Sequence, residues 1–286
     1  MLFGNTIILQ KGASRDTSVV HSSVPRQRFS PTSGSSRMNC LFRLMIAILL
    51  LPLSADCASE KITKESILSN GQERTYYLFV PKTVSPSTPV PLLVTLHGSG
   101  RNGLSLVEKW KSIASNEGVI IVGPNSQDPK RWATPVDGPE FLHELTEALM
   151  KKYSINPRKV YLFGHSGGAV FALIISLMES EYFAATAIHA GSLRQAEGTS
   201  VIKQAKRKIP LKIFVGTQDE YFPLTEVRAT RDELNANGFA VQLVEIAGHN
   251  HWYYDMAPKI NRDAWEFLKD EELRADPRYN HYDFGR

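Results

Sequence analysis

The sequence predicts an α/β fold in which helices cover both faces of a mostly parallel sheet. Short apolar runs alternate with stretches of helical periodicity from about residue 60 onward, the pattern of strand–helix–strand units. Several runs are apolar at consecutive positions, as expected of strands buried on both faces. The 286 residues are 42% hydrophobic and 22% charged, which excludes a wholly disordered or fibrous chain. No internal repeat is found, and no low-complexity linker follows residue 60 apart from the Pro-rich turn Pro81–Pro91, so residues 60–286 are predicted to form one domain.

The first two strands are predicted to form a hairpin. Lys61–Leu68 and Glu73–Val80 flank Asn70-Gly71, a dipeptide typical of tight hairpin turns. The remaining strands are expected at short apolar runs, namely Pro91–His97, Val119–Val122, Val160–Gly164, Ala185–His189, Leu211–Val215 and Val241–Ile246.

Five helices are predicted between and after these strands. One of them, Gly167–Met178, is apolar nearly all round and is therefore expected to be buried. Asn156-Pro157 is expected to close the preceding helix, Glu140–Tyr153. The full set is Leu104–Ala114, Glu140–Tyr153, Gly167–Met178, Thr225–Asn237 and Ile260–Leu268.

Residues 38–59 have the order of a secretory signal peptide. Arg43 precedes the apolar run Leu44–Leu53, which is short for a bilayer span and is followed by small residues. A secreted or periplasmic protein without a stable membrane span is therefore predicted, with an uncleaved anchor as the alternative. Residues 1–37 are rich in Ser, Arg and Pro, and are interpreted as a disordered extension or as sequence upstream of a true start at Met38.

The charge and cysteine content of the body exclude several classes of protein. The net charge of +4 comes from the first 57 residues, and the remainder carries 27 basic and 27 acidic side chains. No nucleic-acid partner is therefore expected. Both cysteines, Cys40 and Cys57, lie in the leader, so the body has no disulfide, cysteine nucleophile or cysteine-bound metal.

The strongest motif is Gly164-His165-Ser166-Gly167-Gly168, which matches G-x-S-x-G. It follows a predicted strand and opens a buried helix, the context in which such a serine stands on a tight turn and acts as a nucleophile. Ser166 is therefore the candidate nucleophile, and a Gly/Ser-rich turn without chemistry is the alternative.

A serine hydroxyl needs a base, and the base needs an orienting acid. Asp219 follows the predicted strand Leu211–Val215 closely and is favoured over its neighbour Glu220, which is interpreted as a solvated charge. His249 and His251 both follow the strand Val241–Ile246, and local chemistry does not separate them as candidate bases.

The other histidines are expected to have structural roles. His97, His165 and His189 stand at predicted strand ends, where packing or bonding to the backbone is preferred, and His143 is placed on a helix surface.

Backbone N–H groups are needed to hold the oxyanion of an acyl-transfer intermediate. The N–H groups of Ser99, after an early strand, and Gly167, after the nucleophile, are the candidates. The same early stretch, Gly98–Gly103, also matches the dinucleotide fingerprint G-x-G-x-x-G. No acidic residue ends the next predicted strand, which argues against a dinucleotide site. No metal-site spacing is found either.

Four motifs, in order, resemble the esterase branch of the α/β-hydrolases. They are PLLVTLHGSGRNG, INPRKVYLFGHSGG, GTQDEYFP and GHNHWYYDMAPKINRDAWEFL, and the resemblance runs from Tyr76 to Leu268. The body looks most like polyhydroxybutyrate depolymerases and feruloyl esterase-like proteins, with S-formylglutathione hydrolase (esterase D) relatives.

The resemblance implies an α/β-hydrolase fold and a Ser–Asp–His triad that cleaves carboxylic esters without metal or organic cofactor. The esterase D-like pattern points to His251 as the base, because Gly248 precedes it by three residues and two tyrosines follow. The feruloyl-esterase pattern G-H-x-W points to His249, but Trp252 stands one position too far along for it, so His251 is favoured as the base and His249 is the alternative.

The substrate is expected to be a small-molecule or polymer-linked ester, and the sequence does not indicate an oligomeric state. Too few residues separate Gly191 from Pro210 for a large cap, so an open site is expected. Aromatic side chains are candidates for an acyl pocket, namely Trp132, Tyr221, Phe222 and Trp252.

Two other functions are compatible with these residues. An acyltransferase or peptidase would use the same triad, since fold and triad do not fix the acceptor. A non-catalytic binding protein on a hydrolase scaffold is the rival of a different class.

Overall fold

The structure is a computed structural model that describes residues 60–193 and 195–282, and side chains are not described for residues 195–199. The predicted extension and signal peptide, residues 1–59, lie outside the described residues. The described residues all belong to one compact unit of the chain, Leu53–Arg286.

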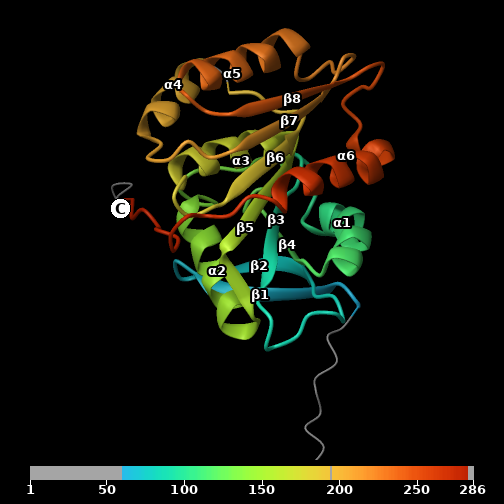
Figure 1. Ribbon diagram of the computed structural model, residues 1–286, viewed down its shortest axis with the longest axis vertical. Coiled ribbons are helices and arrows are strands. Elements are labelled where there is room, and N and C mark those ends of the chain that lie inside the picture. The colour runs from blue at the N-terminus through green and yellow to red at the C-terminus, as the bar shows by residue number, and fades with distance from the viewer. Residues whose placement is uncertain (1–59, 194, 283–286) are drawn as a thin grey trace, which may run out of the picture. The chain divides into compact units, whose positions relative to one another are not determined.

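The centre of this unit is an eight-stranded sheet in the order β1-β2-β4-β3-β5-β6-β7-β8 (Figure 1). The first hairpin and its contact with β4 are antiparallel, and all later neighbours are parallel. The strands are β1 (Thr63–Ser69), β2 (Gln72–Phe79), β3 (Val90–Leu96), β4 (Ile120–Pro124), β5 (Ile155–His165), β6 (Ala185–His189), β7 (Leu211–Gly216) and β8 (Val241–Ile246).

Six helices accompany the sheet in the described part of the chain. They are α1 (Leu104–Glu117), α2 (Pro139–Lys152), α3 (Gly167–Met178), α4 (Gln195–Gln204), α5 (Leu224–Ala236) and α6 (Tyr253–Leu268). Helices α1 and α6 cover one face of the sheet, while α2, α3 and α5 cover the other (Figure 1). The predicted mostly parallel α/β architecture is confirmed.

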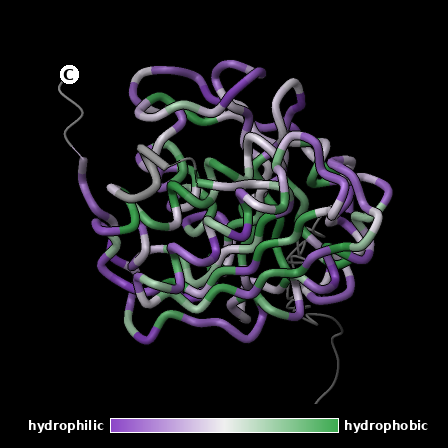
Figure 2. Tube along the Cα trace, turned by 90° about the horizontal axis from the view of Figure 1, so that it is seen from above, coloured by the Kyte–Doolittle hydropathy of each residue, from purple (hydrophilic) through white to green (hydrophobic). Residues whose placement is uncertain are grey.

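Each face of the sheet has its own hydrophobic core. Trp110 of α1 and Tyr253 of α6 are fully buried on one face, and Phe141 of α2 and Leu173 of α3 are buried on the other. Figure 2 shows the same distribution, with the hydrophobic segments gathered inside and hydrophilic segments around them. Burying apolar area on both faces of a sheet is what makes its strands continuously apolar.

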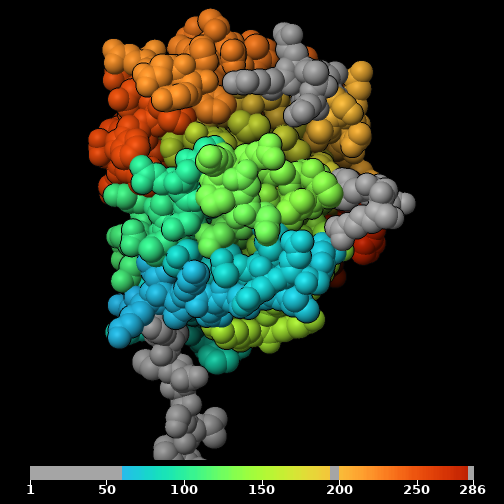
Figure 3. Space-filling model, turned by 180° about the vertical axis from the view of Figure 1, so that it is seen from behind, coloured from blue at the N-terminus to red at the C-terminus, as the bar shows by residue number. Residues whose placement is uncertain are grey.

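Helix α2 contacts strand β1 of the hairpin β1–β2, and the hairpin forms the blue and cyan lower part of the surface seen in Figure 3. Asn70 and Gly71 both have positive φ, at 49° and 73°, which is the geometry that the predicted tight turn requires. Lys152, the last residue of α2, reaches across to Glu65 of β1 at 3.0 Å.

Three elements differ from the sequence prediction by more than three residues. Helix α6 begins at Tyr253 rather than Ile260, because burial of Tyr253 and Ala257 outweighs the cost of Pro258 inside the helix. Strand β5 begins at Ile155, five residues before the predicted strand, and passes through Asn156-Pro157. The helix that this dipeptide was expected to close, α2, ends at Lys152, one residue before its predicted end. Helix α4 was not predicted.

The described residues contain no helix that is both long and apolar enough to cross a membrane.

Candidate functional site

Ser166 stands on the turn between β5 and α3. It has φ 56° and ψ −124°, a conformation that non-glycine residues rarely adopt. Its neighbours explain how the turn closes: a Cβ on Gly164 would come 2.3 Å from the carbonyl oxygen of Gly168. A Cβ on Gly168 would come 2.0 Å from the carbonyl oxygen of Leu96. Glycine is therefore required on both sides for the strand and helix to approach closely.

The side chains of Ser166, His251 and Asp219 form a continuous hydrogen-bonded series. The Nε2 atom of His251 is 2.9 Å from Oγ of Ser166. On the other side of the ring, Nδ1 is 3.0 Å from Oδ2 and 3.1 Å from Oδ1 of Asp219. An imidazole held in this way can take the serine proton on Nε2 while the carboxylate fixes its orientation.

The carboxylate of Asp219 is fully buried, yet it is held in its charged form. Burial alone would raise its pKa. The hydrogen bonds from His251 and from the backbone N–H groups of Phe222 and Tyr221 act in the opposite direction and hold the pKa below its ordinary value. The buried charge therefore stays available to stabilise a protonated imidazole.

The two histidines that the sequence left as alternatives lie in different places. His251 contacts both Ser166 and Asp219, whereas Nε2 of His249 is 3.1 Å from Nε2 of His189. Glu220, the rival acid, is exposed at the rim of the same cavity.

The two candidate oxyanion donors lie side by side. A Cβ built on Gly167 would be 3.6 Å from the backbone nitrogen of Ser99 and 2.7 Å from its Oγ. Both residues line the cavity into which Ser166 opens. Gly167 is the first residue of α3, so its N–H also carries the partial positive charge of the helix N-terminus.

The cavity over Ser166 has a volume of about 660 Å³ and an aromatic rim. Tyr221 and Trp252 at the rim are 62% and 44% exposed, so solvent reaches the site between them. The lining residues are Ser99, Ser166, Gly167, Glu220, Tyr221, Phe222, Asn250, His251 and Trp252.

Trp132, the fourth expected pocket residue, is not among the residues that line this cavity. Its indole nitrogen donates to the carbonyl oxygen of His97 at 2.8 Å, and its ring stacks on Phe171. Trp132 therefore packs the loop after β4 against α3, which a sequence pattern of isolated aromatics does not distinguish from a pocket role.

The other strand-end histidines have the structural contacts expected of them. Nδ1 of His97 is 2.9 Å from the carbonyl oxygen of Gly98, and Nε2 accepts the backbone N–H of Ser126 at 3.2 Å. His165 and His189 contact each other, with their Nδ1 atoms 3.1 Å apart. His143, placed on a helix surface by the sequence, is on α2 but is covered by the stacked ring of Tyr279.

The glycines that match a dinucleotide fingerprint have a packing role here. A Cβ on Gly103 would come 1.9 Å from the carbonyl oxygen of Gly123, so this glycine lets α1 start against the end of β4. The N–H of Gly103 donates to Oδ1 of Asn125 at 2.8 Å.

Sequence analysis missed a buried ion pair that shapes the loop after β4. Arg74 Nη2 and Asp137 Oδ1 are 2.5 Å apart, and both side chains are almost completely buried. Asp137 also accepts the N–H groups of Gln127 and Ala133. The available signal was the position of Arg74 in β2. It stands two and four residues before Tyr76 and Leu78 and so points to the same buried face of the strand.

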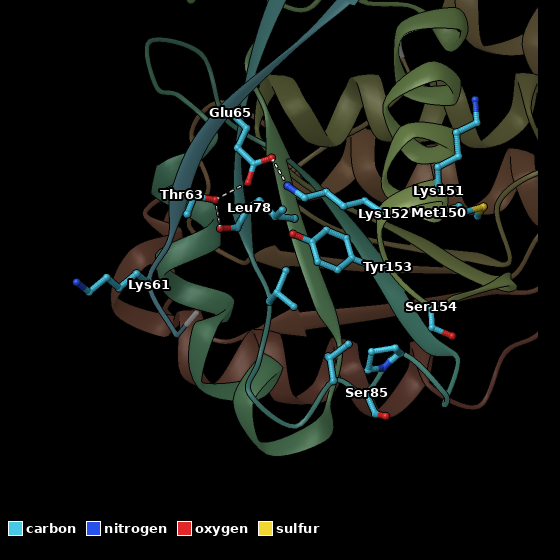
Figure 4. Close-up of a pocket in the computed structure, with 13 residues that line it drawn as sticks. Lys61, Thr63, Glu65, Leu78, Ser85, Met150, Lys151, Lys152, Tyr153 and Ser154 are labelled. Carbon is cyan, nitrogen blue, oxygen red and sulfur yellow. Dashed lines mark hydrogen bonds and ion pairs between the residues drawn. The ribbon is translucent and has the colours of Figure 1, made fainter. Parts of the chain in front are cut away.

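A second cavity of about 720 Å³ lies away from these residues, between β1, β2 and the end of α2 (Figure 4). Figure 4 shows Lys152 bonded to Glu65 beside the ring of Tyr153. Although it is larger, this cavity is lined by no histidine, and its one carboxylate, Glu65, is bonded to Lys152. In residues 60–193 and 195–282, no group of three or more His, Cys, Asp or Glu side chains could hold a metal ion.

The chain is similar to known ester hydrolases. Residues 134–270 match the dienelactone hydrolase family. A bifunctional acetylxylan esterase/xylanase of Neocallimastix patriciarum is 25% identical over 163 residues, which are 55% of this chain and 23% of that protein. A poly(3-hydroxybutyrate) depolymerase of Ralstonia pickettii is 27% identical over 151 residues, 43% of this chain and 30% of that protein. The chain thus spans less than a third of either curated relative.

Solved structures of esterases share the fold. A ferulic acid esterase aligns over 73% of this chain and 97% of its own, with 18% identity and a TM-score of 0.60. An S-formylglutathione hydrolase from Agrobacterium tumefaciens aligns over 73% and 94%, with 17% identity and a TM-score of 0.59. The expected α/β-hydrolase fold without a large cap is confirmed, as is the resemblance to these esterase groups.

Proposed function

We propose that this chain of the α/β-hydrolase fold is a serine esterase, with Ser166 as nucleophile, His251 as base and Asp219 as the orienting acid. The observation that carries the proposal is the position of His251, whose two ring nitrogens are 2.9 Å from Ser166 Oγ and 3.0 Å from Asp219 Oδ2. This arrangement meets the geometric requirement for a base that acts on a hydroxyl.

The reaction proceeds in two steps. Ser166 Oγ attacks the ester carbonyl carbon while its proton passes to Nε2 of His251, and the N–H groups of Ser99 and Gly167 hold the oxyanion. The ester bond then breaks, and the alcohol leaves with the proton from Nε2. Water attacks the acyl-enzyme in the same manner, giving its proton to His251, and the acid is released as Ser166 recovers its proton. No metal or organic cofactor takes part in this scheme.

The open rim supports water as the acyl acceptor and an ester carried on a bulky group as the substrate. Tyr221 and Trp252 leave the cavity accessible from solvent, and no large cap covers it. The relatives named above suggest the esters to test: acetylated xylan, poly(3-hydroxybutyrate), methyl ferulate and S-formylglutathione. Measuring the ratio of hydrolysis to transfer onto added alcohols and amines separates an esterase from an acyltransferase.

Labelling with a fluorophosphonate, followed by peptide mass mapping, tests the triad. We expect Ser166 to be labelled, and we expect the label to be lost in Ser166→Ala and His251→Ala. The comparison is His249→Ala, which should still be labelled when the reaction is taken to completion, because His249 does not contact Ser166 Oγ and is not the proposed base. A folded wild-type protein that takes no label would favour a non-catalytic binding protein instead.

Export is part of the proposal. It is supported by the order of charged, apolar and small residues over 38–59. N-terminal sequencing of the protein recovered from the periplasm or culture medium should find a terminus close to residue 60. A terminus upstream of Met38 would contradict it.

A further inference from the structure

Three histidines that take no part in the proposed reaction form a chain behind Ser166. The Nδ1 atoms of His165 and His189 are 3.1 Å apart, and the Nε2 atoms of His189 and His249 are also 3.1 Å apart. His165 and His189 end the neighbouring strands β5 and β6 (Figure 1), and His249 lies on the loop after β8. The central ring of His189 thus has both nitrogens engaged by other imidazoles.

All three rings are held in their neutral form. Burial lowers the pKa of His165 to about 3, and burial together with the neighbouring histidines lowers the pKa of His189 well below its usual value. Burial also lowers the pKa of His249, although Asp219 and Asp255 partly offset the effect. A neutral imidazole has one N–H donor and one acceptor nitrogen, so each contact in the chain joins a donor to an acceptor.

This requirement links the tautomers of rings that do not touch. If His189 carries its proton on Nδ1, it donates to His165 and accepts from His249, so both end rings must be protonated on Nε2. If His189 carries its proton on Nε2, it donates to His249 and accepts from His165, so both end rings must be protonated on Nδ1. In either case, the two ends share one tautomer and the central ring has the other.

The chain connects the segments that carry the proposed triad. The backbone N–H of Ser166 donates to the carbonyl oxygen of His189 at 3.1 Å. The carbonyl oxygen of His249 accepts the N–H of Gln218, the residue before Asp219, at 2.9 Å. His249 itself stands two residues before His251. One hydrogen-bonded unit therefore contacts the nucleophile turn, the acid loop and the base loop.

We propose that the His165–His189–His249 chain is a positioning device for the proposed esterase, and that His249 is the positioning residue that ties the loop of His251 to the turn of Ser166. His249 acts through its bond to His189 and does not contact the reacting atoms. The alternative is a set of rings that only fill space under the site.

The first test is nuclear magnetic resonance of the wild-type protein with ¹⁵N-labelled histidine, which reports the protonated nitrogen of each ring. Single His→Gln variants assign the signals. We expect His165 and His249 to share one tautomer and His189 to have the opposite one at neutral pH. Two end rings in different tautomers would overturn the proposal. This arm requires no activity, so it stands even if the proposed function fails.

The second test is kinetic and rests on the proposed function. His249→Leu removes the bond to His189 and should lower kcat about tenfold, the effect of losing one hydrogen bond that holds the reactive geometry, with KM changing less than about twofold. His249→Gln keeps a polar nitrogen near His189 and should recover most of kcat.

The matched control is His143→Leu, which removes a histidine from α2 and should leave kcat unchanged. Equal kcat in His249→Leu and the wild type would overturn the positioning role. So would equal losses of kcat in the Leu and Gln variants, which would indicate that only the volume of the ring matters. Should the Leu variant fail to fold, the tautomer measurement on the wild type decides the question.

Discussion

Asp219 and His251 are 32 positions apart in the sequence, and Nδ1 of His251 lies 3.0 Å from Oδ2 of Asp219. The carboxylate also accepts two backbone N–H groups of its own loop, from Tyr221 and Phe222. The loop of Asp219 therefore holds the carboxylate through bonds that do not involve His251. His251 in turn directs its Nε2 atom toward Ser166.

Replacing Asp219 by Asn should retain the fold while removing activity. The amide fills the same space but favours the wrong tautomer of His251, so kcat should fall by about ten-thousand-fold, the size of the loss when a Ser–His–Asp triad loses this carboxylate. Steady-state kinetics on a chromogenic ester, with circular dichroism as a check of folding, measures the effect. A loss smaller than about tenfold would assign the acid to another residue, and Glu220→Gln is the comparison to make.

Removing the exposed aromatic rings should weaken binding more than chemistry. Tyr221 and Trp252 line the rim of the cavity, 62% and 44% exposed, and no hydrogen bond joins either side chain to the proposed triad among the described residues. Tyr221→Ala and Trp252→Ala should raise KM for esters with a large acyl or alcohol group, while KM for a simple acetate ester changes little. A matching fall in kcat for both classes of ester would contradict a role in binding.

Removing one partner of the buried ion pair Arg74–Asp137 should lower the free energy of unfolding substantially. Arg74→Met leaves Asp137 as a buried charge without its partner, and we expect a loss of about 3 to 5 kcal/mol in the free energy of unfolding. Urea denaturation measures it. The double variant Arg74→Met/Asp137→Leu should lose less than Arg74→Met alone, because no uncompensated charge remains. The surface pair Lys152 and Glu65, broken by Lys152→Met, is the control and should cost less than about 1 kcal/mol.

Glu179 should make the protein less stable as the pH rises toward neutrality. Burial at the end of α3 raises the pKa of this carboxyl from 4.5 to about 7, and hydrogen bonding to the backbone N–H of Asn280 offsets only part of the effect. Between these two values the unfolded chain ionises before the folded one, so stability falls with increasing pH and the loss is complete above about pH 7. The total change is up to about 3 kcal/mol.

Glu179→Gln provides the comparison, since the amide oxygen can still accept from Asn280. The difference in unfolding free energy between the variant and the wild type should grow in favour of the variant from about pH 4.5 to about pH 7. A difference that does not change with pH would show that Glu179 has an ordinary pKa in the folded protein.

Much of the fold follows from local pattern. The boundaries of α3, β6 and β8 agree with the prediction residue for residue. The extra turns of α6 were missed because Pro258 suggests a break, and only the packing of Tyr253 and Ala257 in the core shows that the helix tolerates it.

The proposed site was less completely predictable. The motif around Ser166 fixes the turn by itself, and Asp219 follows a strand end closely. His249 and His251 could not be separated by local chemistry, since both follow β8 and both are half-buried. The two rings differ in their partners: His251 contacts Ser166 and Asp219, whereas His249 contacts His189. His189 lies on a strand 60 positions before His249, so local sequence does not reveal this contact.

The residues at the rim of the cavity also lie next to the residues proposed to act in it. Tyr221 and Phe222 follow Asp219 by two and three positions, and Trp252 is adjacent to His251. A natural insertion or deletion in either loop would therefore displace the acid or the base together with the rim. We expect lineages of this protein to acquire new substrate preferences by exchanging side chains in loops of constant length, while changes in chain length accumulate elsewhere, as between β6 and β7.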